Sequence, residues 1–377
     1  MRIVVVGLGL FGEMTGGSAR YLSGMTQAMR RNGHEVEVVT AVGLAGDSTG
    51  TERGWIGQVV RTIRRAVLVH PRAMATVVRS RPDVVNVHFA FDGLGAVLVA
   101  RLLRIPIVVM FQGPWAREAV ATGHRGAWPL SSRLRRFIEL RVYRSASRCI
   151  VLSGAFREVL ATEYGVPLER IRVIPAGIET SAFESLLDRE DARRRVGLPA
   201  SDGFTLVTVR RLVARMGLDL LLRAVARLED RDVRLAIAGT GPERSSLEDL
   251  ADRLGLGGRV AFMGKVPDAD LAAFYAAGDL CVVPTRELEG FGYVALESLA
   301  AGTPVLATAV GGLVDLVGAF APRRLVAADP ASLAAGIAEA MVGPLEDRLE
   351  CRRYAAQFDW QAIAPRVEAV FREARAS

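Results

Sequence analysis

Short β-branched runs alternate with helix-patterned segments along nearly the whole chain, and this alternation most constrains the fold. Arg2 to Gly7 is a strand-like run, Ser18 to Arg31 repeats apolar residues at helical spacing, and Val36 to Thr40 resumes strand character. A strand, a glycine-rich loop, a helix and a second strand form a unit of the doubly wound kind. The sequence therefore predicts an α/β protein with parallel sheets.

The alternation of strands and helices occurs in two successive regions of the chain, which we interpret as two domains. The chain has 377 residues, long enough for two globular domains, and a charge-rich segment from Glu179 to Asp202 separates the halves. We predict an N-terminal Rossmann-like domain over residues 1–178, a C-terminal one over 179–355, and a last helix over 356–377 that packs back toward the N-terminal domain. The remaining strand candidates are 84–89, 107–111, 149–153, 204–209, 233–238, 260–263, 280–284 and 304–308.

Charge is distributed unevenly between the halves. The formal net charge is +7, and residues 1–178 contain 24 arginines and 12 acidic residues. A basic front half suggests an anionic partner or a membrane surface, and the alternative is a set of solvated helix faces. No nucleic-acid-binding module accompanies this charge, so we expect no nucleic-acid partner.

The spacing of the cysteines and the length of the apolar runs indicate in which cellular compartment the protein works. Cys149, Cys281 and Cys351 lie far apart, at no metal-binding or redox spacing, which favours a reducing cytoplasm. The most apolar stretch, Val84 to Phe111, is interrupted by one aspartate and two arginines, and no window of about 20 uncharged residues remains. We predict a cytoplasmic protein, and peripheral contact with the inner membrane face stays open.

Three glycines follow the first strand candidate. Gly7, Gly9 and Gly12 match the fingerprint G-x-G-x-x-G, which taken alone indicates an NAD(P)-dependent oxidoreductase. That fingerprint needs its third glycine in the first helical turn and an acidic residue at the end of the second strand, where this chain has Thr40. The oxidoreductase is therefore the alternative function.

Two loops are candidates for binding phosphate. Gly16, Gly17 and Ser18 open the first helix, whose N-terminus favours an anion, although an ordinary connection has the same composition. In the rear half, the run from Glu289 to Glu297 brings two glycines to a helix start, so free amides should point beyond the strand ends. Diphosphate is the natural occupant there, and the alternative for the two glutamates is a capping and a solvated role.

Arginines gather directly after the strand candidate Phe204 to Val209. Arg210, Arg211 and Arg215 stand at the edge that would face a cleft between the domains. Guanidinium groups bind phosphate oxygens well, and a surface charge cluster is the competing interpretation.

These motifs, in this order and spacing, resemble the family 4 glycosyltransferases. The resemblance covers nearly the whole chain and includes Asp83 to His88, Ile174 to Ile178, Gly239 to Pro242 and Phe358 to Trp360. It implies a GT-B fold, with two doubly wound Rossmann-like domains facing a cleft. It also implies a retaining, metal-independent transfer of a sugar from a nucleoside-diphosphate sugar to a hydroxyl acceptor, which is a small molecule, a glycan or a lipid-linked group.

The resemblance assigns roles by position. Glu289 would hold hydroxyls of the donor sugar, Glu297 the ribose, and the amides of Gly290 to Gly292 the diphosphate. Arg211 would offset charge that grows on the departing nucleoside diphosphate. His88 would contact the sugar or position the acceptor, and its alternative is a satisfied core histidine. The further donor-side candidates are Arg215, Gly239, Gly241, Lys265, Val266, Gly290, Phe291, Gly292 and Tyr293.

The sequence departs from the family pattern at two places. Met216 stands where the family usually has lysine, five residues after Arg211, so one phosphate contact is missing or comes from Arg215. Gln112 stands where a histidine is frequent, and its amide can hydrogen-bond but cannot act as an acid or base. The acceptor-side candidates are Gln112, Trp115 and Glu118.

Few residues of the chain are candidates for holding a cofactor or a metal ion. Lys265 is the only lysine and lies at the turn that would hold the base, which disfavours a lysine Schiff base with pyridoxal phosphate. Asp268 and Asp270 match a metal-binding Asp-x-Asp pattern formally, but a helix N-cap at Asp268 explains it better. We therefore expect no cofactor and no metal.

Two arginine-rich stretches of the front half are patterned as amphipathic helices. They are residues 53–81 and 125–148, where arginines alternate with large apolar residues. Such a helix either rests on anionic lipid or packs on its own domain with solvated arginines. The sequence leaves both alternatives open.

Overall fold

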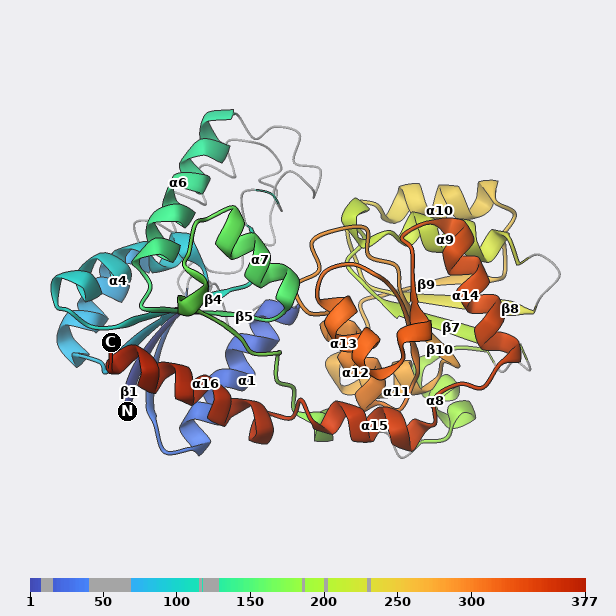
Figure 1. Ribbon diagram of the computed structural model, residues 1–377. Helices are drawn as coiled ribbons and strands as arrows, with labels where there is room; N and C mark the ends of the chain where they lie inside the picture. The colour runs from blue at the N-terminus through green and yellow to red at the C-terminus, as the bar shows by residue number, and fades with distance from the viewer. Residues whose placement is uncertain are drawn as a thin grey trace. The chain divides into compact units, whose positions relative to one another are not determined.

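Two six-stranded parallel sheets with flanking helices form the framework of the described part of the chain (Figure 1). This computed structural model describes residues 1–7, 16–40, 69–114, 117, 129–184, 187–199, 203–228 and 232–377, with side chains of 129–132 excepted. Every strand pairing in the described residues is parallel, and parallel neighbours require crossover connections instead of tight hairpins. The expected α/β class is confirmed.

The first sheet has the order β2-β1-β3-β4-β5-β6. Its strands are β1 (Arg2–Gly7), β2 (Glu35–Thr40), β3 (Val84–Val87), β4 (Ile107–Phe111), β5 (Arg148–Val151) and β6 (Ile171–Val173). The chain winds outward in both directions from β1 and β3, which is the doubly wound arrangement. Ligands of such sheets bind beyond the carboxyl ends of the strands where the order reverses.

The second sheet has the order β12-β11-β10-β7-β8-β9. Its strands are β7 (Phe204–Val209), β8 (Val233–Ala238), β9 (Val260–Gly264), β10 (Leu280–Val283), β11 (Val305–Thr308) and β12 (Leu325–Val326). Here the order reverses between β7 and β10. The segments that follow these two strands, which hold the arginine cluster and the Glu289 loop, are therefore brought to one edge of the sheet.

Helices connect the strands of each sheet. Those beside the first sheet are α1 (Gly17–Arg31), α4 (Ala90–Leu102), α6 (Pro129–Ser145), α7 (Gly154–Thr162) and α16 (Trp360–Arg375), and residues 69–80 are helical as well. Those beside the second are α8 (Arg189–Val196), α9 (Leu218–Ala226), α10 (Arg244–Arg253), α11 (Leu271–Ala276), α12 (Tyr293–Ala300), α13 (Gly312–Phe320), α14 (Pro330–Val342) and α15 (Arg348–Ala356). Short 3₁₀ turns are η1 (Leu168–Arg170), η2 (Thr180–Phe183), η3 (Ala214–Met216), η4 (Asp268–Asp270) and η5 (Pro322–Arg324).

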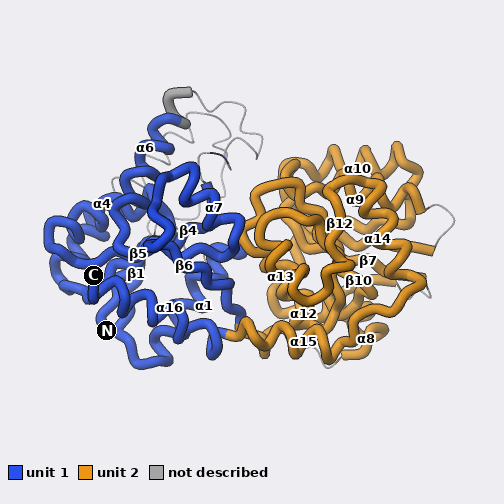
Figure 2. The backbone as a smooth tube through the Cα atoms, in the orientation of Figure 1, with its two compact units in different colours: residues 1–120, 124–178, 360–377 blue, residues 121–123, 179–359 orange. Residues whose placement is uncertain are grey.

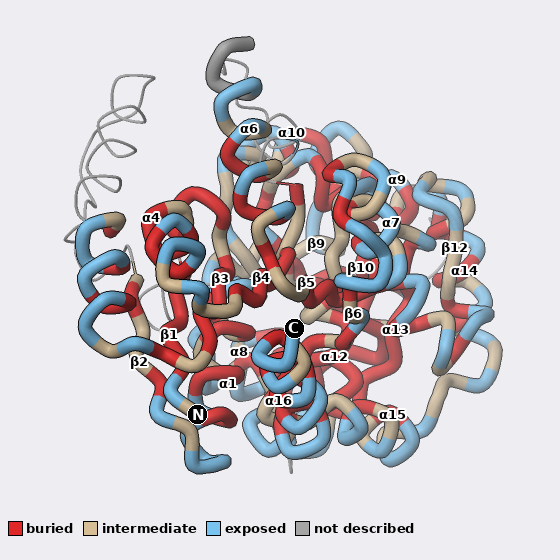
Figure 3. The backbone as a smooth tube through the Cα atoms, turned by 60° about the vertical axis from the view of Figure 1, so that its left-hand side comes forward, coloured by how far each residue is buried: buried red, intermediate tan, exposed pale blue. Residues whose placement is uncertain are grey.

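The central strands are buried on both faces, which explains why they read as unbroken apolar runs. All five residues of β4 are buried, and β3 and β10 are buried throughout. In Figure 3 the strands β3, β4 and β5 run through the buried, red part of the first unit. The edge strands β6 and β12 were not predicted, because they are short and only partly buried.

The chain divides into two compact units (Figure 2). In the described residues, unit 1 extends to Ile178 and takes up the chain again at Trp360, whereas unit 2 extends from Glu179 to Asp359. The sequence placed its first boundary after residue 178 and its second after residue 355. Asp359 ends unit 2 by accepting hydrogen bonds from the backbone amide and the hydroxyl of Thr180, at 3.1 and 2.7 Å.

Helix α16 belongs to unit 1 and is anchored there by the indole of Trp360. A β carbon at Gly24 would lie 2.1 Å from that indole, and one at Gly177 would lie 2.6 Å from it. The Tyr21 ring meets the indole edge-on, with centroids 5.3 Å apart. Two glycines thus make the space that this large side chain fills.

Two further expectations concern local structure. Asp268 does not cap a helix, since it begins η4, and the cap residue of α11 is Asp270, which makes no capping hydrogen bond. The side chain of Asp270 pairs instead with Arg195 at 2.9 Å. In the described ranges no helix is both long and apolar enough to cross a bilayer.

Candidate functional site

A carboxylate and a guanidinium meet where the second sheet reverses its strand order. Arg210 follows β7, and Thr285 and Glu289 lie in the loop after β10. Oε2 of Glu289 accepts hydrogen bonds from Nη2 of Arg210 at 2.7 Å and from the hydroxyl of Thr285 at 3.1 Å. The same Nη2 also donates to the hydroxyl of Thr285. These three side chains therefore form one closed set of hydrogen bonds.

The electrostatic surroundings keep Glu289 ionised. Burial by itself raises the pKa of Glu289, but the nearby charges of Arg210 and Arg215 and the hydrogen bond from Thr285 lower it below its ordinary value. Oε1, the other carboxylate oxygen, receives no hydrogen bond from the residues that the structure describes. Glu289 thus offers one free, charged acceptor atom.

The loop after Glu289 presents backbone donors at the start of α12. In the described structure the amides of Gly290, Phe291 and Gly292 donate no hydrogen bond. Gly292 has a φ of 97° and precedes the first helical residue, Tyr293, whose ring lies 5.8 Å from that of the buried Phe291. The positive end of the helix dipole adds to these donors, so this loop favours an anion.

Gly311 and Gly312 were grouped with this motif by sequence, and the structure gives them a packing role. A β carbon at Gly311 would lie 2.0 Å from the carbonyl oxygen of Glu289, and one at Gly312 would lie 2.5 Å from that of Gly290. The amide of Gly312 donates to the Glu289 carbonyl at 2.9 Å. The glycines therefore fix the backbone of the Glu289 loop.

The arginine cluster divides into side chains with different surroundings. Arg210 is buried against Glu289, whereas Arg211 is exposed and its guanidinium makes no hydrogen bond or ion pair with the described residues. Arg215 is buried, and its Nη1 donates to the carbonyl of Leu288 at 3.0 Å. Leu288 has a φ of 56°, a strained conformation for leucine, directly before Glu289. Met216 is buried nearby and leaves Arg211 as the exposed cation of this strand end.

Gly239 and Gly241 support the arginine cluster from β8. A β carbon at Gly239 would lie 1.8 Å from the carbonyl oxygen of Arg210, and one at Gly241 would lie 2.3 Å from that of Leu212. The amide of Gly239 already donates to the carbonyl of Gly264 at 2.7 Å. Both glycines therefore allow a close approach of two backbones.

The remaining candidates of unit 2 lie on α12 and after β9. Glu297 is buried on α12, where Oε2 accepts a hydrogen bond from the hydroxyl of Tyr275 at 2.8 Å. Lys265 is exposed directly after the edge strand β9, and Val266 is partly buried beside it. Lys265 is thus at the surface, whereas the Glu297 carboxylate is held inside the unit.

In unit 1, His88 follows β3 and is buried in a chain of hydrogen bonds. Its Nε2 lies 2.6 Å from Oδ1 of Asn86, and its Nδ1 lies 3.3 Å from Nε2 of Gln112. Burial lowers the pKa of His88 to about 3, so the ring is neutral. Both ring nitrogens have partners, which is the arrangement of a satisfied core histidine.

The glycine loop of unit 1 is described from Gly16 onward. Gly16 has a φ of 110° and caps α1, whose first residues are Gly17 and the exposed Ser18. Gly7 ends β1, and a β carbon there would lie 2.6 Å from the side chain of Leu22. The predicted residues Gly9, Gly12, Trp115 and Glu118 lie outside the described residues.

The sequence placed Arg210 in the arginine cluster but did not pair it with Glu289, and two further polar side chains of the site were missed. Thr285 donates to Glu289 and Tyr275 donates to Glu297, and no sequence pattern marks either residue. In the described ranges no three His, Cys, Asp or Glu residues gather in a way that could hold a metal ion.

Comparison with known proteins assigns a family. Residues 15–182 match the family described as Glycosyltransferase Family 4, and residues 188–358 match Glycosyl transferases group 1. D-inositol 3-phosphate glycosyltransferase 1 of Catenulispora acidiphila is 34% identical over 308 residues, which are 78% of this chain and 72% of that protein. The MMP alpha-(1->4)-mannosyltransferase of Mycolicibacterium hassiacum is 30% identical over 294 residues, 75% of this chain and 68% of that protein.

Solved structures share the fold. Sucrose-phosphate synthase from Thermosynechococcus elongatus has a TM-score of 0.77 at 24% identity, covering 100% of this chain and 99% of that one. Anabaena Alr3699/HepE in complex with UDP and glucose has a TM-score of 0.71 at 20% identity, covering 99% of both chains. The GT-B architecture expected from the sequence is confirmed. On this fold and these relatives, the chain belongs to glycosyltransferase family 4.

Proposed function

We propose that this glycosyltransferase takes its sugar from a nucleoside-diphosphate donor and transfers it to a hydroxyl acceptor with retention of configuration. One observation carries the proposal. The ionised Glu289 has one oxygen fixed by Arg210 and Thr285 and the other open, directly before a row of unbonded amides. A charged acceptor next to an anion-binding turn suits a sugar that is joined to a diphosphate.

The donor would be held by charge and by backbone donors. The amides of Gly290 to Gly292 and the N-terminus of α12 would receive the diphosphate, and the exposed Arg211 would balance the charge that develops as it leaves. These groups supply positive charge without a metal, so we propose a metal-independent reaction. Full activity after treatment with a chelator would support this part, and restoration by added Mg²⁺ would contradict it.

The role of Glu289 follows from its charge state. A carboxylate whose pKa is lowered is a poor general acid or base, but it is a good acceptor for sugar hydroxyls. We therefore propose that catalysis rests on positioning and electrostatic stabilisation, with the acceptor attacking the face that the diphosphate leaves. The family assignment and this geometry argue against the NAD(P)-dependent alternative.

The acceptor is a hydroxyl compound, and the relatives guide the first choice of substrates. Several of them are D-inositol 3-phosphate glycosyltransferases, so that compound belongs in the first acceptor panel. The basic front half is consistent with an acceptor that carries phosphate.

The test is release of nucleoside diphosphate from a panel of donors, with variants of two neighbouring glutamates. Glu289→Gln and Glu289→Ala should reduce turnover to background while circular dichroism stays unchanged. Glu287 is exposed in the same loop, and Glu287→Gln is the matched control that should keep wild-type turnover. Unchanged turnover in the Glu289 variants would refute the assignment.

Peripheral contact with an anionic membrane is a separate proposal for unit 1. On α6 the side chains of Leu134 and Phe137 are 60% and 51% exposed, and the guanidinium of Arg141 lies 4.9 Å from the Phe137 ring. Arg133 of the same helix is also exposed, so two arginines of α6 lie close in sequence to this apolar pair. Apolar side chains with flanking cations favour an anionic lipid surface.

Sedimentation with vesicles tests the membrane contact. Wild-type protein should pellet with phosphatidylglycerol vesicles at low salt and stay in solution with phosphatidylcholine alone. Leu134→Ser with Phe137→Ser should abolish pelleting with anionic vesicles, and equal pelleting of this variant would contradict the proposal.

A further inference from the structure

The guanidinium of Arg210 is a buried charged group that contacts Glu289 and is not among the groups proposed to contact the donor. Only 4% of its side chain is exposed, yet it carries a full positive charge at the end of β7. Its Nη2 serves Thr285 and Glu289 together, and its Nε has no hydrogen-bond partner in the described structure. Burying such a charge is unfavourable unless it is paired, so its position requires Glu289.

We infer that Arg210 is a positioning residue of the sugar-transfer reaction, which turns the Glu289 carboxylate so that Oε1 alone faces the donor sugar. This inference rests on the proposed function. Oε2 is occupied by two donors, and Oε1 receives none from the described residues. The carboxylate therefore has one bound oxygen and one open oxygen in a fixed orientation.

Arg210 also balances the charge of a carboxylate that burial would otherwise neutralise. Burial raises the pKa of Glu289, and Arg210 is the strongest of the groups that lower it. A protonated Glu289 would lose acceptor strength toward sugar hydroxyls. The charge of Arg215 also lowers this pKa, but Arg215 donates to the Leu288 carbonyl and Arg211 is exposed, so Arg210 is the arginine that holds Oε2.

The fold fixes the backbones of both partners. The amide of Arg210 donates to the carbonyl of Ala238 at 2.9 Å, and Gly239 allows the Arg210 carbonyl to approach β8 closely. Gly311 does the same for the carbonyl of Glu289. Two backbones held in this way leave the side-chain pair little freedom to reorient, as a positioning role requires.

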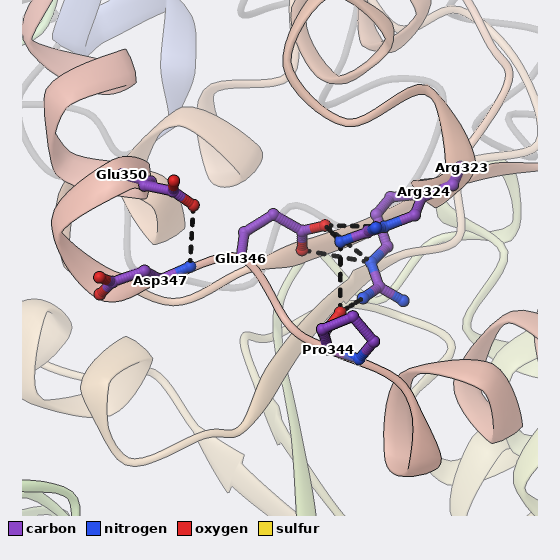
Figure 4. Close-up of polar contacts among 6 residues, drawn as sticks. All are labelled: Arg323, Arg324, Pro344, Glu346, Asp347 and Glu350. Atoms are coloured by element: carbon purple, nitrogen blue, oxygen red, sulfur yellow. Dashed lines mark hydrogen bonds and ion pairs between the residues drawn. The ribbon is translucent and has the colours of Figure 1, made fainter.

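A second buried arginine–glutamate pair in unit 2 provides a matched control (Figure 4). Nε of Arg324 lies 3.3 and 3.2 Å from the two carboxylate oxygens of Glu346, and its Nη2 donates to the Pro344 carbonyl at 3.0 Å. Only 2% of the Arg324 side chain is exposed. This pair joins η5 to the segment before α15 and includes no candidate site residue, so it stands for a purely structural arginine.

The experiment compares Arg210→Gln, Arg210→Lys and Arg324→Gln. kcat and KM for the donor are measured from pH 4 to 8, together with the thermal midpoint of each variant. Arg210→Gln should lower kcat by about tenfold or more and move the acidic limb of the pH profile upward by about one unit, since Glu289 then protonates more readily. Arg210→Lys should restore part of kcat and part of the position of the acidic limb. Lysine returns the positive charge but lacks the planar guanidinium that can donate to two acceptors at once.

Arg324→Gln should lower the thermal midpoint and leave the acidic limb in place. The positioning role would be overturned if Arg210→Gln lost about as much stability as Arg324→Gln but kept the wild-type kcat and the wild-type acidic limb. Thr285→Ala provides the second route if Arg210→Gln does not fold. It should shift the limb in the same direction by a smaller amount, and an unshifted limb would count against the inference.

An NMR titration of the Glu289 side-chain carboxyl carbon separates this inference from the proposed function. A protein that transfers sugar from no donor would refute the proposed function. In that case the titration still decides on Arg210: the midpoint of Glu289 should rise in Arg210→Gln and stay unchanged in Arg324→Gln. Equal midpoints in wild type and Arg210→Gln would overturn the inference.

Discussion

Gly311 lies so close to Glu289 that a β carbon at position 311 would be 2.0 Å from the Glu289 carbonyl oxygen. The two residues come from loops after different strands, β11 and β10. The site carboxylate is therefore placed by backbone contact as well as by its side-chain partners. A glycine of another loop thus helps to determine where the Glu289 backbone lies.

The first prediction concerns that contact. Gly311→Ala should destabilise the protein by about 1–3 kcal/mol and lower turnover, because φ is 54° at this position and the obstacle is backbone that cannot rotate away. Gly257→Ala is the matched control, since nothing lies within 4 Å of its added β carbon. Urea unfolding and donor turnover are measured for both variants. Equal stability of the two would contradict a close backbone contact between Gly311 and Glu289.

Arg211 should act on the reaction without acting on stability. Arg211 is exposed and makes no hydrogen bond or ion pair with the described residues, so Arg211→Gln should keep the wild-type thermal midpoint. We expect kcat to fall by about 10²-fold, as for removal of one preplaced charge opposite a developing anion. Arg253→Gln removes another exposed arginine of unit 2 and should leave kcat unchanged. A wild-type kcat in Arg211→Gln would remove this residue from the mechanism.

His88 should make unit 1 less stable in acid. The folded pKa of His88 is about 3 and its ordinary value is 6.5, so the unfolded chain binds the extra proton between these values. The stability contribution is therefore complete above pH 6.5 and falls as the pH drops toward 3, by up to about 1.4 kcal/mol per pH unit. His88→Gln should show a weaker pH dependence of urea unfolding between pH 7 and 5. Parallel curves for both proteins would show that His88 does not titrate in this way.

Trp360 and Gly24 should be energetically coupled. Gly24→Ala places a methyl group 2.1 Å from the indole, which should displace the start of α16 and destabilise unit 1. Trp360→Ala should cost about 3–5 kcal/mol by itself, and in that background Gly24→Ala should be nearly neutral because the indole is gone. A double-mutant cycle from unfolding measurements tests this, and strictly additive effects would argue against the contact.

Much of the fold could be predicted because its central strands are buried on both faces. Such strands appear in the sequence as unbroken β-branched runs, as in Ile107 to Phe111, and the alternation with helices gave both sheets. The edge strands Ile171 to Val173 and Leu325 to Val326 escaped prediction. They are too short and too exposed on one side to carry such a pattern.

The site was predicted at the level of loops and less well at the level of single side chains. Sequence placed Glu289 and the arginine cluster at the same sheet edge, but it did not give Arg210 and Arg211 different surroundings. Neighbouring side chains of an extended segment point to opposite sides, and only the three-dimensional packing determines which one is buried. Gly239 and Gly311 carried a second ambiguity, since glycine serves close backbone packing as well as ligand contact.

Calorimetric titration with nucleoside diphosphates tests the central claim most directly. UDP, GDP and ADP are titrated into wild-type protein, Arg211→Gln and the control Arg253→Gln, with NAD(H) as the competing ligand. One diphosphate should bind wild type and the control equally, and at least about tenfold more weakly to Arg211→Gln. Binding of NAD(H) instead, or equal diphosphate affinity in all three proteins, would contradict a diphosphate site formed by Arg211 together with the start of α12.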